Sequence, residues 1–564
     1  MKKNILKLSL FAAGAVLSIG IASGLNAGSF EVKADSYGYS GGDGTQYDPF
    51  LISSLADLEH LADSVNSGSS ETQKKFFKQT CDIGSEDGAK LTKPIGYHKD
   101  DAPFRGVYDG GNHNVWVDIN FDAYAAGQGI GLFGYVYRYA SDTKYNYSVK
   151  NINVYGEIKG QVNDLNGTSI GGVVGISQST SSTAPAGIIN CNNYATIDYK
   201  GTFSSFREIY PAGIVGRSLS ATSIINCINY GTIKGTVEGN ASAYIRGGGI
   251  TGEVNGTTNI INCANLGKLD FTTVKTSMMG GIAGCPEGGG SPYMINIQNC
   301  YSNGDFKFTQ TSGSGDKYCG GIIGYWNGNA ADVVNNAYYI PSDVAPNGCG
   351  NVPSARDTSK MYSITEEQAK AEENVADSLI AKLNTNTAAL ENPFSNYWVK
   401  NAGEYPVPTT YSLSTQIAYN YVSEPAETND FRIAFGIDVS KGYNKEMLMS
   451  GQSVGIKVYK NKSLALTLDM TNKTATKAGG ESVGFYSKYD KDMLYFTLEL
   501  GDLIATPSDA KVLYSFTTYK TAGEQTQEFF GTGWSFASLL NAYLNMPAYA
   551  HNASLLQCKA DLGL

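Results

Sequence analysis

Short apolar runs, separated by glycine and by polar residues, recur through the middle of the chain. Each recurrence opens with a five-residue phrase, usually small-Gly-apolar-apolar-Gly, and an asparagine follows 10 to 17 residues later, most often in the context apolar-apolar-Asn-Cys. The glycine pairs are Gly131/Gly134, Gly172/Gly175, Gly213/Gly216, Gly249/Gly252, Gly281/Gly284 and Gly321/Gly324. The asparagines lie 39, 36, 36, 37 and 36 residues apart, at Asn151, Asn190, Asn226, Asn262, Asn299 and Asn335. A near-constant period of this size predicts a solenoid in which each repeat is one coil.

Each repeat contains three short apolar stretches, which in the third repeat are residues 213–216, 223–230 and 231–237. Three strands per turn predict a parallel β-helix, of about seven or eight coils over the whole repeat region. Asparagines at one corner would form an amide ladder, because parallel strands stack about 4.8 Å apart. Glycine suits tight corners or close backbone approach, since it lacks a Cβ atom. We therefore expect both residue sets to be structural.

The glycine phrases resemble those of the GLUG repeat family of bacterial surface proteins. The matching phrases are Gly-Leu-Phe-Gly at 131–134, Gly-Val-Val-Gly at 172–175 and Gly-Ile-Val-Gly at 213–216. Residues 44–53 and 104–113 are similar to the lead-in coils that precede such repeats, so that the resemblance covers roughly residues 41–408. It implies an extracellular β-helix, often in adhesin-like or host-facing proteins, and it implies no single reaction.

The two ends of the chain differ from the repeats. Residues 1–34 have a basic start, an apolar stretch and a small-residue cleavage site, which predict a signal peptide. Residues 54–66 carry apolar residues on one helical face, and we expect this helix to cap the open end of the β-helix. The predicted organisation is a signal peptide (1–34), a cap with lead-in coils (35–126), the repeat β-helix with its closing segment (127–408) and a β-sandwich domain (409–564).

Two short helices, at 365–371 and 375–383, are predicted within the closing segment. Beyond it the glycine phrases disappear and alternating strands follow. Seven of them predict an antiparallel β-sandwich with a terminal helical stretch at 535–544; they are 417–422, 431–439, 453–459, 464–470, 482–486, 493–500 and 511–519.

Composition narrows the classes of partner. The formal net charge is −10, and it becomes −13 when four lysines and one glutamate leave with residues 1–34. Nucleic acid is therefore not expected as a partner, because a polyanion needs a concentrated basic surface. No later stretch is long and apolar enough to predict a transmembrane segment. We expect a protein that is secreted, or held non-covalently on the surface of a Gram-positive type bacterium.

The positions of the cysteines favour a role in core packing over disulfide bridges or metal binding. Cys191, Cys227, Cys263 and Cys300 each follow a ladder asparagine, so they are expected to form one buried column of thiols on successive coils. Oxidation of some pair stays open, since neighbouring coils lie within disulfide range. A metal site is not expected, because no CxxC pair or nearby histidine supports one.

The sequence offers little for catalysis. β-Helix hydrolases and lyases need acids and bases gathered across a groove, but the acidic residues near the repeat strands are scattered singly, as at Glu208, Glu238, Glu253 and Asp270. The Asp100-Asp101 pair is expected to be a solvated turn. The four histidines form no HExxH motif; they are His60, His98, His113 and His551. We therefore predict no enzyme, assign no catalytic, cofactor-binding or metal-ligating residue, and expect no cofactor.

A binding protein is the favoured hypothesis. A rigid solenoid presents its variable insertions at fixed corners, and loops on rigid scaffolds are where binding concentrates; the insertions are 178–186, 203–210 and 286–292. The first candidate ligand is a host extracellular glycoprotein, and glycans are a further candidate. Alternatives are immunoglobulin binding or immune evasion, a polysaccharide lyase or glycoside hydrolase on a β-helix, and a spacer that only carries the C-terminal domain. The binding residues are not predictable from the sequence.

Overall fold

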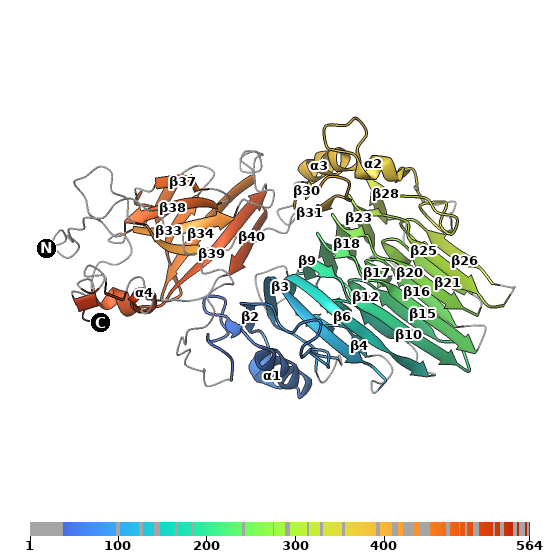
Figure 1. Ribbon diagram of the computed structural model, residues 1–564, viewed down its shortest axis with the longest axis horizontal. Helices are drawn as coiled ribbons and strands as arrows, with labels where there is room; N and C mark the ends of the chain where they lie inside the picture. Colours follow the sequence, from blue (N-terminus) through green and yellow to red (C-terminus); the bar gives the residue numbers. More distant parts are fainter. Residues whose placement is uncertain are drawn as a thin grey trace. The chain divides into compact units, whose positions relative to one another are not determined.

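The computed structural model describes most of residues 38–408 and separate stretches beyond them (Figure 1). Up to residue 408 the gaps are 98–101, 123–127, 140, 142–146, 164–166, 182–183, 240–242, 275, 288–293, 313–314, 328–330, 352–355 and 391–394. The predicted signal peptide, His98 and Asp100-Asp101 lie outside the described residues. The chain divides into two compact units, one of residues 52–410 and one of residues 1–51 with 411–564.

The first unit is a parallel β-solenoid built from three sheets. Sheet 1 has 18 strands: β1 (Phe50–Ile52), β2 (Phe76–Gln79), β3 (Val107–Asn120), β6 (Val149–Asn163), β9 (Ala186–Asn193), β10 (Thr196–Phe203), β13 (Thr222–Ile225), β14 (Ile228–Asn229), β15 (Ile233–Gly239), β18 (Thr258–Ile261), β19 (Ala264–Asn265), β20 (Leu269–Thr273), β23 (Ile295–Gln298), β24 (Tyr301–Ser302), β25 (Phe306–Gln310), β27 (Val333–Asn335), β28 (Ala337–Tyr339) and β29 (Met361–Ser363). Sheet 2 stacks β4 (Gly129–Ile130), β7 (Thr168–Gly171), β11 (Glu208–Ala212), β16 (Tyr244–Gly248), β21 (Thr276–Gly280) and β26 (Lys317–Gly320). Sheet 3 stacks β5 (Phe133–Arg138), β8 (Val174–Ser179), β12 (Val215–Ser220), β17 (Thr251–Asn255) and β22 (Ala283–Pro286).

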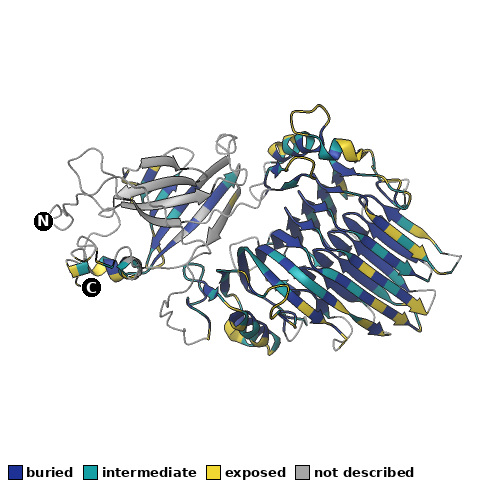
Figure 2. Ribbon diagram, viewed as in Figure 1, coloured by how far each residue is buried: buried dark blue, intermediate teal, exposed yellow. Residues whose placement is uncertain are grey.

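Equivalent residues of successive repeats lie side by side in register. Ile197 pairs with Ile233, and Val215 pairs with both Val174 and Thr251, all in parallel strands. The five strands of sheet 3 correspond to about five complete turns, fewer than the seven or eight expected. Isolated bridges extend sheet 3 beyond both ends, for example Ile95 to Phe133 and Ile323 to Cys349. The missing turns are thus incomplete coils. Figure 2 shows buried residues running along the stacked strands.

The asparagine corner is confirmed, with one correction. Five of the predicted asparagines have φ between 54° and 56°, the left-handed region that asparagine tolerates better than most residues. The sixth corner residue is Asn336, with φ of 52°, and not Asn335. Asn335 still belongs to strand β27 and pairs with Gln298. The chain has two consecutive asparagines here, and the strand register selects the second.

The first glycine of each phrase is required by close approach. A Cβ atom on Gly172, Gly213 or Gly249 would lie 2.2 to 2.3 Å from the side chain of Asn193, Asn229 or Asn265, respectively. These three asparagines form a second, buried amide ladder that the sequence analysis missed. Each Nδ2 donates to the next Oδ1, at 2.9 Å from Asn193 to Asn229 and 2.8 Å from Asn229 to Asn265. At these repeats the left-handed corner is therefore made by asparagine, and glycine makes room across the coil.

The four column cysteines stack inside the solenoid as predicted. All four are buried and free. The backbone N–H of Cys191 lies 3.5 Å from the Sγ of Cys227, and the same contact recurs from Cys227 to Cys263 at 3.5 Å and from Cys263 to Cys300 at 3.4 Å. Each thiol thus takes part in the coil-to-coil stacking of the interior.

Helix α1 (Leu55–Asn66) forms where the pattern predicted, and a short 3-10 turn, η1 (Ser70–Thr72), follows it. Ser54 caps α1 by accepting from the N–H of Asp57, and the helix buries Leu58, Leu61, Ala62 and Val65. The apolar face predicted from the sequence therefore packs inward.

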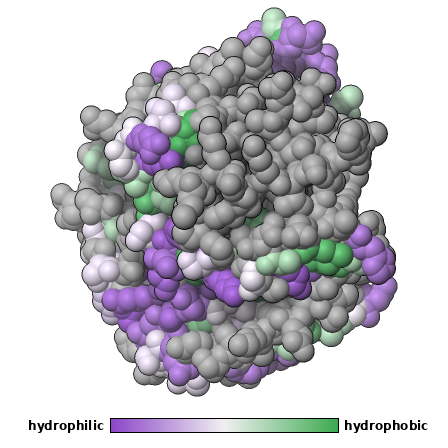
Figure 3. All heavy atoms as spheres, turned by 90° about the vertical axis from the view of Figure 1, so that its left-hand side faces the viewer, coloured by the Kyte–Doolittle hydropathy of each residue, from purple (hydrophilic) through white to green (hydrophobic). Residues whose placement is uncertain are grey.

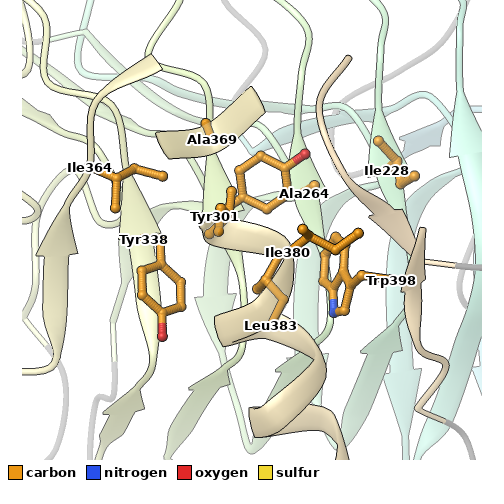
Figure 4. Close-up of a cluster of buried hydrophobic side chains, with 10 residues drawn as sticks. Ile228, Ala264, Tyr301, Tyr338, Ile364, Ala369, Ile380, Leu383 and Trp398 are labelled. Carbon is orange, nitrogen blue, oxygen red and sulfur yellow. The ribbon is translucent and has the colours of Figure 1, made fainter. Parts of the chain in front are cut away.

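The closing segment lies against the asparagine corner of the coils. It contains α2 (Glu366–Lys370), α3 (Leu379–Ala389), β30 (Trp398–Val399) and β31 (Val407–Pro408), so the second helix begins four residues later than predicted and extends further. Figure 4 shows Ile380, Leu383 and Trp398 packed against side chains of the coils, namely Ile228, Ala264, Tyr301 and Tyr338. Asn396 joins the ladder: its N–H donates to Asn226 Oδ1 at 3.1 Å, and its carbonyl accepts from Asn262 Nδ2 at 2.8 Å.

The C-terminal unit contains two antiparallel sheets, as the predicted sandwich requires. One has the order β32 (Gln416–Asn420), β33 (Arg432–Asp438), β38 (Met493–Glu499), β37 (Tyr486–Asp490), and the other β36 (Thr474–Lys477), β35 (Ser463–Asp469), β34 (Gln452–Lys460), β39 (Tyr514–Ala522), β40 (Gln525–Phe530). A 3-10 turn, η3 (Pro507–Lys511), occupies the start of the last predicted strand, and helix α4 (Phe536–Leu544) follows. Of the predicted strand 482–486, Ser482 forms an isolated bridge to Thr476, Tyr486 begins β37, and residues 484–485 lie outside the described residues. Strands β36 and β40 were not predicted. On the face seen in Figure 3 the described residues are mostly hydrophilic, with smaller hydrophobic areas.

Candidate ligand-binding face of the solenoid

Sheets 2 and 3 meet at the glycine phrase, and their outward side chains converge there. At Gly172, Gly213, Gly249 and Gly281 the residue three positions before the first glycine lies on sheet 2, and the residue four positions after it lies on sheet 3. At Gly321 the first of these residues, Tyr318, lies on sheet 2, and the second, Tyr325, lies beyond the strands of sheet 3. These partners, seven apart in sequence, touch in three repeats: Arg246 Nη1 lies 2.6 Å from Glu253 Oε1, the Arg217 guanidinium lies 4.6 Å from the Tyr210 ring centre, and the Tyr318 and Tyr325 ring centres are 4.6 Å apart. We call this strip of paired side chains the lateral face.

Strand alternation explains why these side chains point away from the coil interior. Successive side chains on a strand point to opposite faces. Ile245 is fully buried in the core, so its neighbour Arg246 points outward. Ser218 hydrogen-bonds Thr258 inside the coil at 2.6 Å, so its neighbour Arg217 also points outward. Because outward-pointing side chains of the two sheets touch each other, the outer surface of the solenoid is concave where sheets 2 and 3 meet along the lateral face.

Arg246 is the centre of a charge cluster on this face. Its guanidinium contacts Glu253 Oε1, Glu208 Oε1 at 2.5 Å and Glu287 Oε2. Glu208 lies in the insertion 203–210, at the outer end of sheet 2, and Glu287 lies in the insertion 286–292, beyond sheet 3. The side chain of Arg217 contacts the other oxygen of Glu253. Two of the three predicted insertions therefore send a carboxylate to the same arginine, from opposite edges of the lateral face.

Burial and charge act against each other in the cluster. Burial raises the pKa of Glu253 to about 7, although Arg217 and Arg246 both favour its carboxylate form. Burial also opposes the charge of Arg246, but the facing Cys285 and Glu253 raise the pKa of this arginine above its usual value, and it remains a cation. Glu287 is more open; burial opposes its charge as well, but the hydrogen bond from Arg246 lowers its pKa. Glu253 is thus the member of the cluster that titrates near neutrality.

The interpretation of Glu208 and Glu253 as scattered single residues was wrong. The structure brings both to Arg246, whereas Glu238 and Asp270 form separate ion pairs on sheet 1, with Lys200 at 3.1 Å and Lys307 at 3.3 Å. The sequence did contain a signal for this cluster. Arg217 and Glu253 both lie four positions after the first glycine of their repeats, and they are paired residues of β12 and β17. Reading that position down the repeats would have found them.

Aromatic side chains lie on the coils near the cluster, in one pair where sheet 2 strands begin and in another across a later glycine phrase. Phe206 is 47% exposed and packs edge-on against Tyr244, with ring centres 5.2 Å apart. Tyr318 and Tyr325 make a second edge-on pair, and burial together with the neighbouring Asp316, Tyr325 and Tyr244 raises the pKa of Tyr318. We call Phe206, Tyr244, Tyr318 and Tyr325 the aromatic rim. In edge-on pairs at least one ring keeps a face uncovered by its partner, so it can receive a ligand.

A second row of rings lies on sheet 1 and has a different character. Trp116, Tyr155, Tyr194 and Tyr230 stack on successive coils, with centre distances of 5.0, 4.4 and 4.5 Å. The last two pairs are parallel to within 7°. The ring faces cover one another, and Tyr230 also packs against the closing segment. This row is therefore a structural ladder more than a binding platform.

The described histidines lie on separate elements. His113 lies on β3 with its Nδ1 3.3 Å from Asp82 Oδ1, and burial lowers its pKa. His60 lies on helix α1, far along the chain from the lateral face, and His551 lies in the C-terminal unit. Within the described residues, no three His, Cys, Asp or Glu side chains are placed to hold a metal ion. The helices of that same part of the chain include none with the length and apolarity to cross a bilayer.

Comparison with known proteins adds one structural likeness. No protein-family model matches the chain, and no curated protein matches it. A solved structure described as "a putative immunoglobulin A1 protease from Bacteroides ovatus" aligns with a TM-score of 0.44 at 18% sequence identity, over 66% of this chain and 95% of that chain.

Proposed function

We propose that this protein is an extracellular, adhesin-like binding protein that engages a host glycoprotein through the lateral face of its solenoid. The observation that carries the proposal is the convergence of two insertions on Arg246 beside the aromatic rim. Tyrosine and arginine dominate the energetics of protein interfaces, because they bury a large area and still offer polar contacts. An exposed Phe206 next to Tyr244 supplies such an anchor.

The charge cluster supports binding by holding the insertions in place more than by contacting the partner directly. The guanidinium of Arg246 is occupied by three carboxylates, so its bonding capacity is largely used within the protein. Its effect is to hold the end of insertion 203–210 and the start of insertion 286–292 on the solenoid. Loops that are fixed before a partner arrives lose less conformational entropy on binding. The cluster thus preorganises the edges of the lateral face.

Capture from mucosal secretions tests the proposal. The mature chain (residues 35–564) would be immobilised, and retained proteins identified before and after enzymatic deglycosylation. The double substitution Phe206→Ala with Tyr325→Ala is expected to weaken capture at least about tenfold, as for interface anchors. Tyr139→Ala is the matched control, because Tyr139 is 38% exposed and lies outside the aromatic rim.

The result also separates the partner classes. Retention of antibody chains in place of mucosal glycoproteins would favour an immunoglobulin partner. Equal capture by the double variant and by Tyr139→Ala would contradict the lateral face as the binding surface. Release of reducing sugar or unsaturated uronate from a polysaccharide panel would overturn the non-enzymatic proposal.

A further inference from the structure

Two adjoining hollows lie where the closing segment meets the last coils of sheet 1. Their volumes are about 260 and 320 Å³, and both are lined by Tyr338 and Lys382. The first runs along helix α3, and the second lies between β28, β29 and α2. This region is separate from the lateral face, since it involves sheet 1 and the closing segment only. We call the pair of hollows the α3 cavity.

The hydrogen-bonded asparagine ladder ends at Asn299, one coil before the corner that lines this cavity. The amide of Asn299 is fully used, because its two N–H groups are shared among Asn262 Oδ1 at 2.7 Å, the Leu383 carbonyl at 2.9 Å and Thr387 Oγ1 at 3.0 Å, and its Oδ1 accepts from Asn386 Nδ2 at 3.1 Å. Asn336 occupies the next corner and lines the cavity. The following coil provides no asparagine, since β29 pairs its Met361 with Ala337. Among the described residues the amide of Asn336 has no hydrogen-bond partner, so this corner, one coil beyond the bonded ladder, has an amide available to a ligand.

A stack of two tyrosine rings also ends at the α3 cavity. Tyr362 of β29 stacks on Tyr338 of β28, with ring centres 5.5 Å apart and planes within 28°. Strand β29 is the last strand paired in this part of sheet 1, and Tyr362 is 36% exposed. Among the described rings, Tyr338 covers only one side of Tyr362. Unlike the ladder from Trp116 to Tyr230, this stack presents an open ring face.

The remaining lining residues are rich in hydrogen-bonding groups. The Oε1 of Gln368 accepts from the Thr365 N–H at 3.0 Å, which leaves the NH₂ of its amide for a ligand. Lys382 contributes an ammonium group that is 3.3 Å from Asp377 Oδ1. The hydroxyl of Ser378, a fully buried residue that lines the cavity, has no hydrogen-bond partner among the described residues. A buried hydroxyl without a partner destabilises the protein until something bonds to it.

We infer that the α3 cavity is a saccharide site that takes one hydroxyl-rich sugar ring. An uncovered aromatic ring receives the apolar face of the sugar, and the amides of Asn336 and Gln368 bond its hydroxyls. The volumes, about 260 and 320 Å³, lie just below and just inside the lower end of the range for small-molecule sites, roughly 300 to 1,000 Å³, which suits one ring better than an oligosaccharide. The paired charges of Lys382 and Asp377 favour a neutral sugar. The inference rests on the proposed function only for the source of that sugar, the glycan of the captured glycoprotein.

Free monosaccharides test the site directly. Saturation-transfer NMR and isothermal titration calorimetry on the mature full chain would use a panel of neutral hexoses and N-acetylhexosamines. One or more members are expected to bind, and Tyr362→Ala is expected to weaken that binding about tenfold through loss of the stacked face. Gln368→Ala should weaken it by a smaller factor, while Phe206→Ala should leave it unchanged. Thermal unfolding of each variant checks that the solenoid remains folded.

The outcomes separate this inference from the proposed function. Sugar binding that is weakened in both cavity variants and kept in Phe206→Ala supports the site, whatever the capture experiment shows. No binding by any sugar in the panel overturns it, as does equal binding by wild type and both cavity variants. Capture of a glycoprotein with no monosaccharide binding would leave the lateral face supported and remove the α3 cavity.

Discussion

Substitution of Glu253 by glutamine tests whether the central carboxyl of the lateral face weakens the fold at neutral pH. Burial raises the pKa of Glu253 to about 7 in the folded protein, from a usual value of 4.5. Between these two pH values the folded state retains the proton and the unfolded state has lost it. Stability therefore falls as pH rises, because the folded state binds more protons. The favourable contribution is complete below pH 4.5 and is lost as pH rises through about 7.

The size of the effect follows from the shift. A change of one pKa unit corresponds to 1.36 kcal/mol, so a shift from 4.5 to about 7 predicts a change of about 3 kcal/mol in the free energy of unfolding. Glutamine has nearly the same shape and does not titrate. The free energy of unfolding of the wild type, minus that of Glu253→Gln, should thus decrease by about 3 kcal/mol between pH 4.5 and pH 8.

Urea unfolding followed by tryptophan fluorescence gives the measurement, since Trp116, Trp326 and Trp398 lie in the solenoid unit. Glu238→Gln is the matched control, because Glu238 is an exposed carboxylate paired with Lys200 on a neighbouring strand. The difference in the free energy of unfolding between wild type and Glu238→Gln should change little with pH. Parallel pH profiles for wild type and Glu253→Gln, or a difference that grows in favour of the wild type as pH rises, would refute the reasoning.

Three further predictions concern the scaffold. Asn226→Ala should lower the free energy of unfolding by about 2 to 4 kcal/mol, because it removes the acceptor of the Asn396 N–H and forces alanine to a φ of 54°. Urea unfolding measures this loss, and a value below about 1 kcal/mol would contradict a stabilising role of the ladder. Gly213→Ala should cost about 3 kcal/mol or more, since its Cβ would lie 2.3 Å from Asn229 Cγ. The control Gly479→Ala has no atom within 4 Å and should be neutral. The four column thiols, Cys227 among them, should react with a thiol reagent only after unfolding, and rapid modification of the native protein would argue against their burial.

The sequence predicted the solenoid well because its strongest signal is periodic. A corner residue that recurs every 36 to 39 positions fixes the register of all strands that follow it, and the parallel pairing of Ile224 with Ile188 and Ile260 is a direct consequence. The prediction failed where the pattern was locally degenerate. At residues 335 and 336 two asparagines compete for one corner, and only the pairing of Asn335 with Gln298 decides between them.

The candidate site was harder to predict because its residues meet at two different separations along the sequence. Arg246 meets Glu208 across one coil, 38 positions away, and meets Glu253 across the glycine phrase, seven positions away. A search for clustered charges along the chain finds neither relation. The α3 cavity is less accessible still, because it depends on where helix α3 lies against the coils, and the repeat pattern carries no information about that segment.

The two positions that form the lateral face also show why the charge cluster is a local feature and no part of the repeat scaffold. On the coil before it these positions hold Ser169 and Ile176, and on the coil after it they hold Met278 and Cys285, all four buried. A structural ladder repeats its residue type from coil to coil, as the asparagines and cysteines do. The charges are instead confined to the coils beside the insertions 203–210 and 286–292, and each of these insertions supplies one of the carboxylates. In the binding function proposed above, the cluster would hold Glu208 and Glu287, and with them the parts of the two insertions nearest the coils, before a partner arrives.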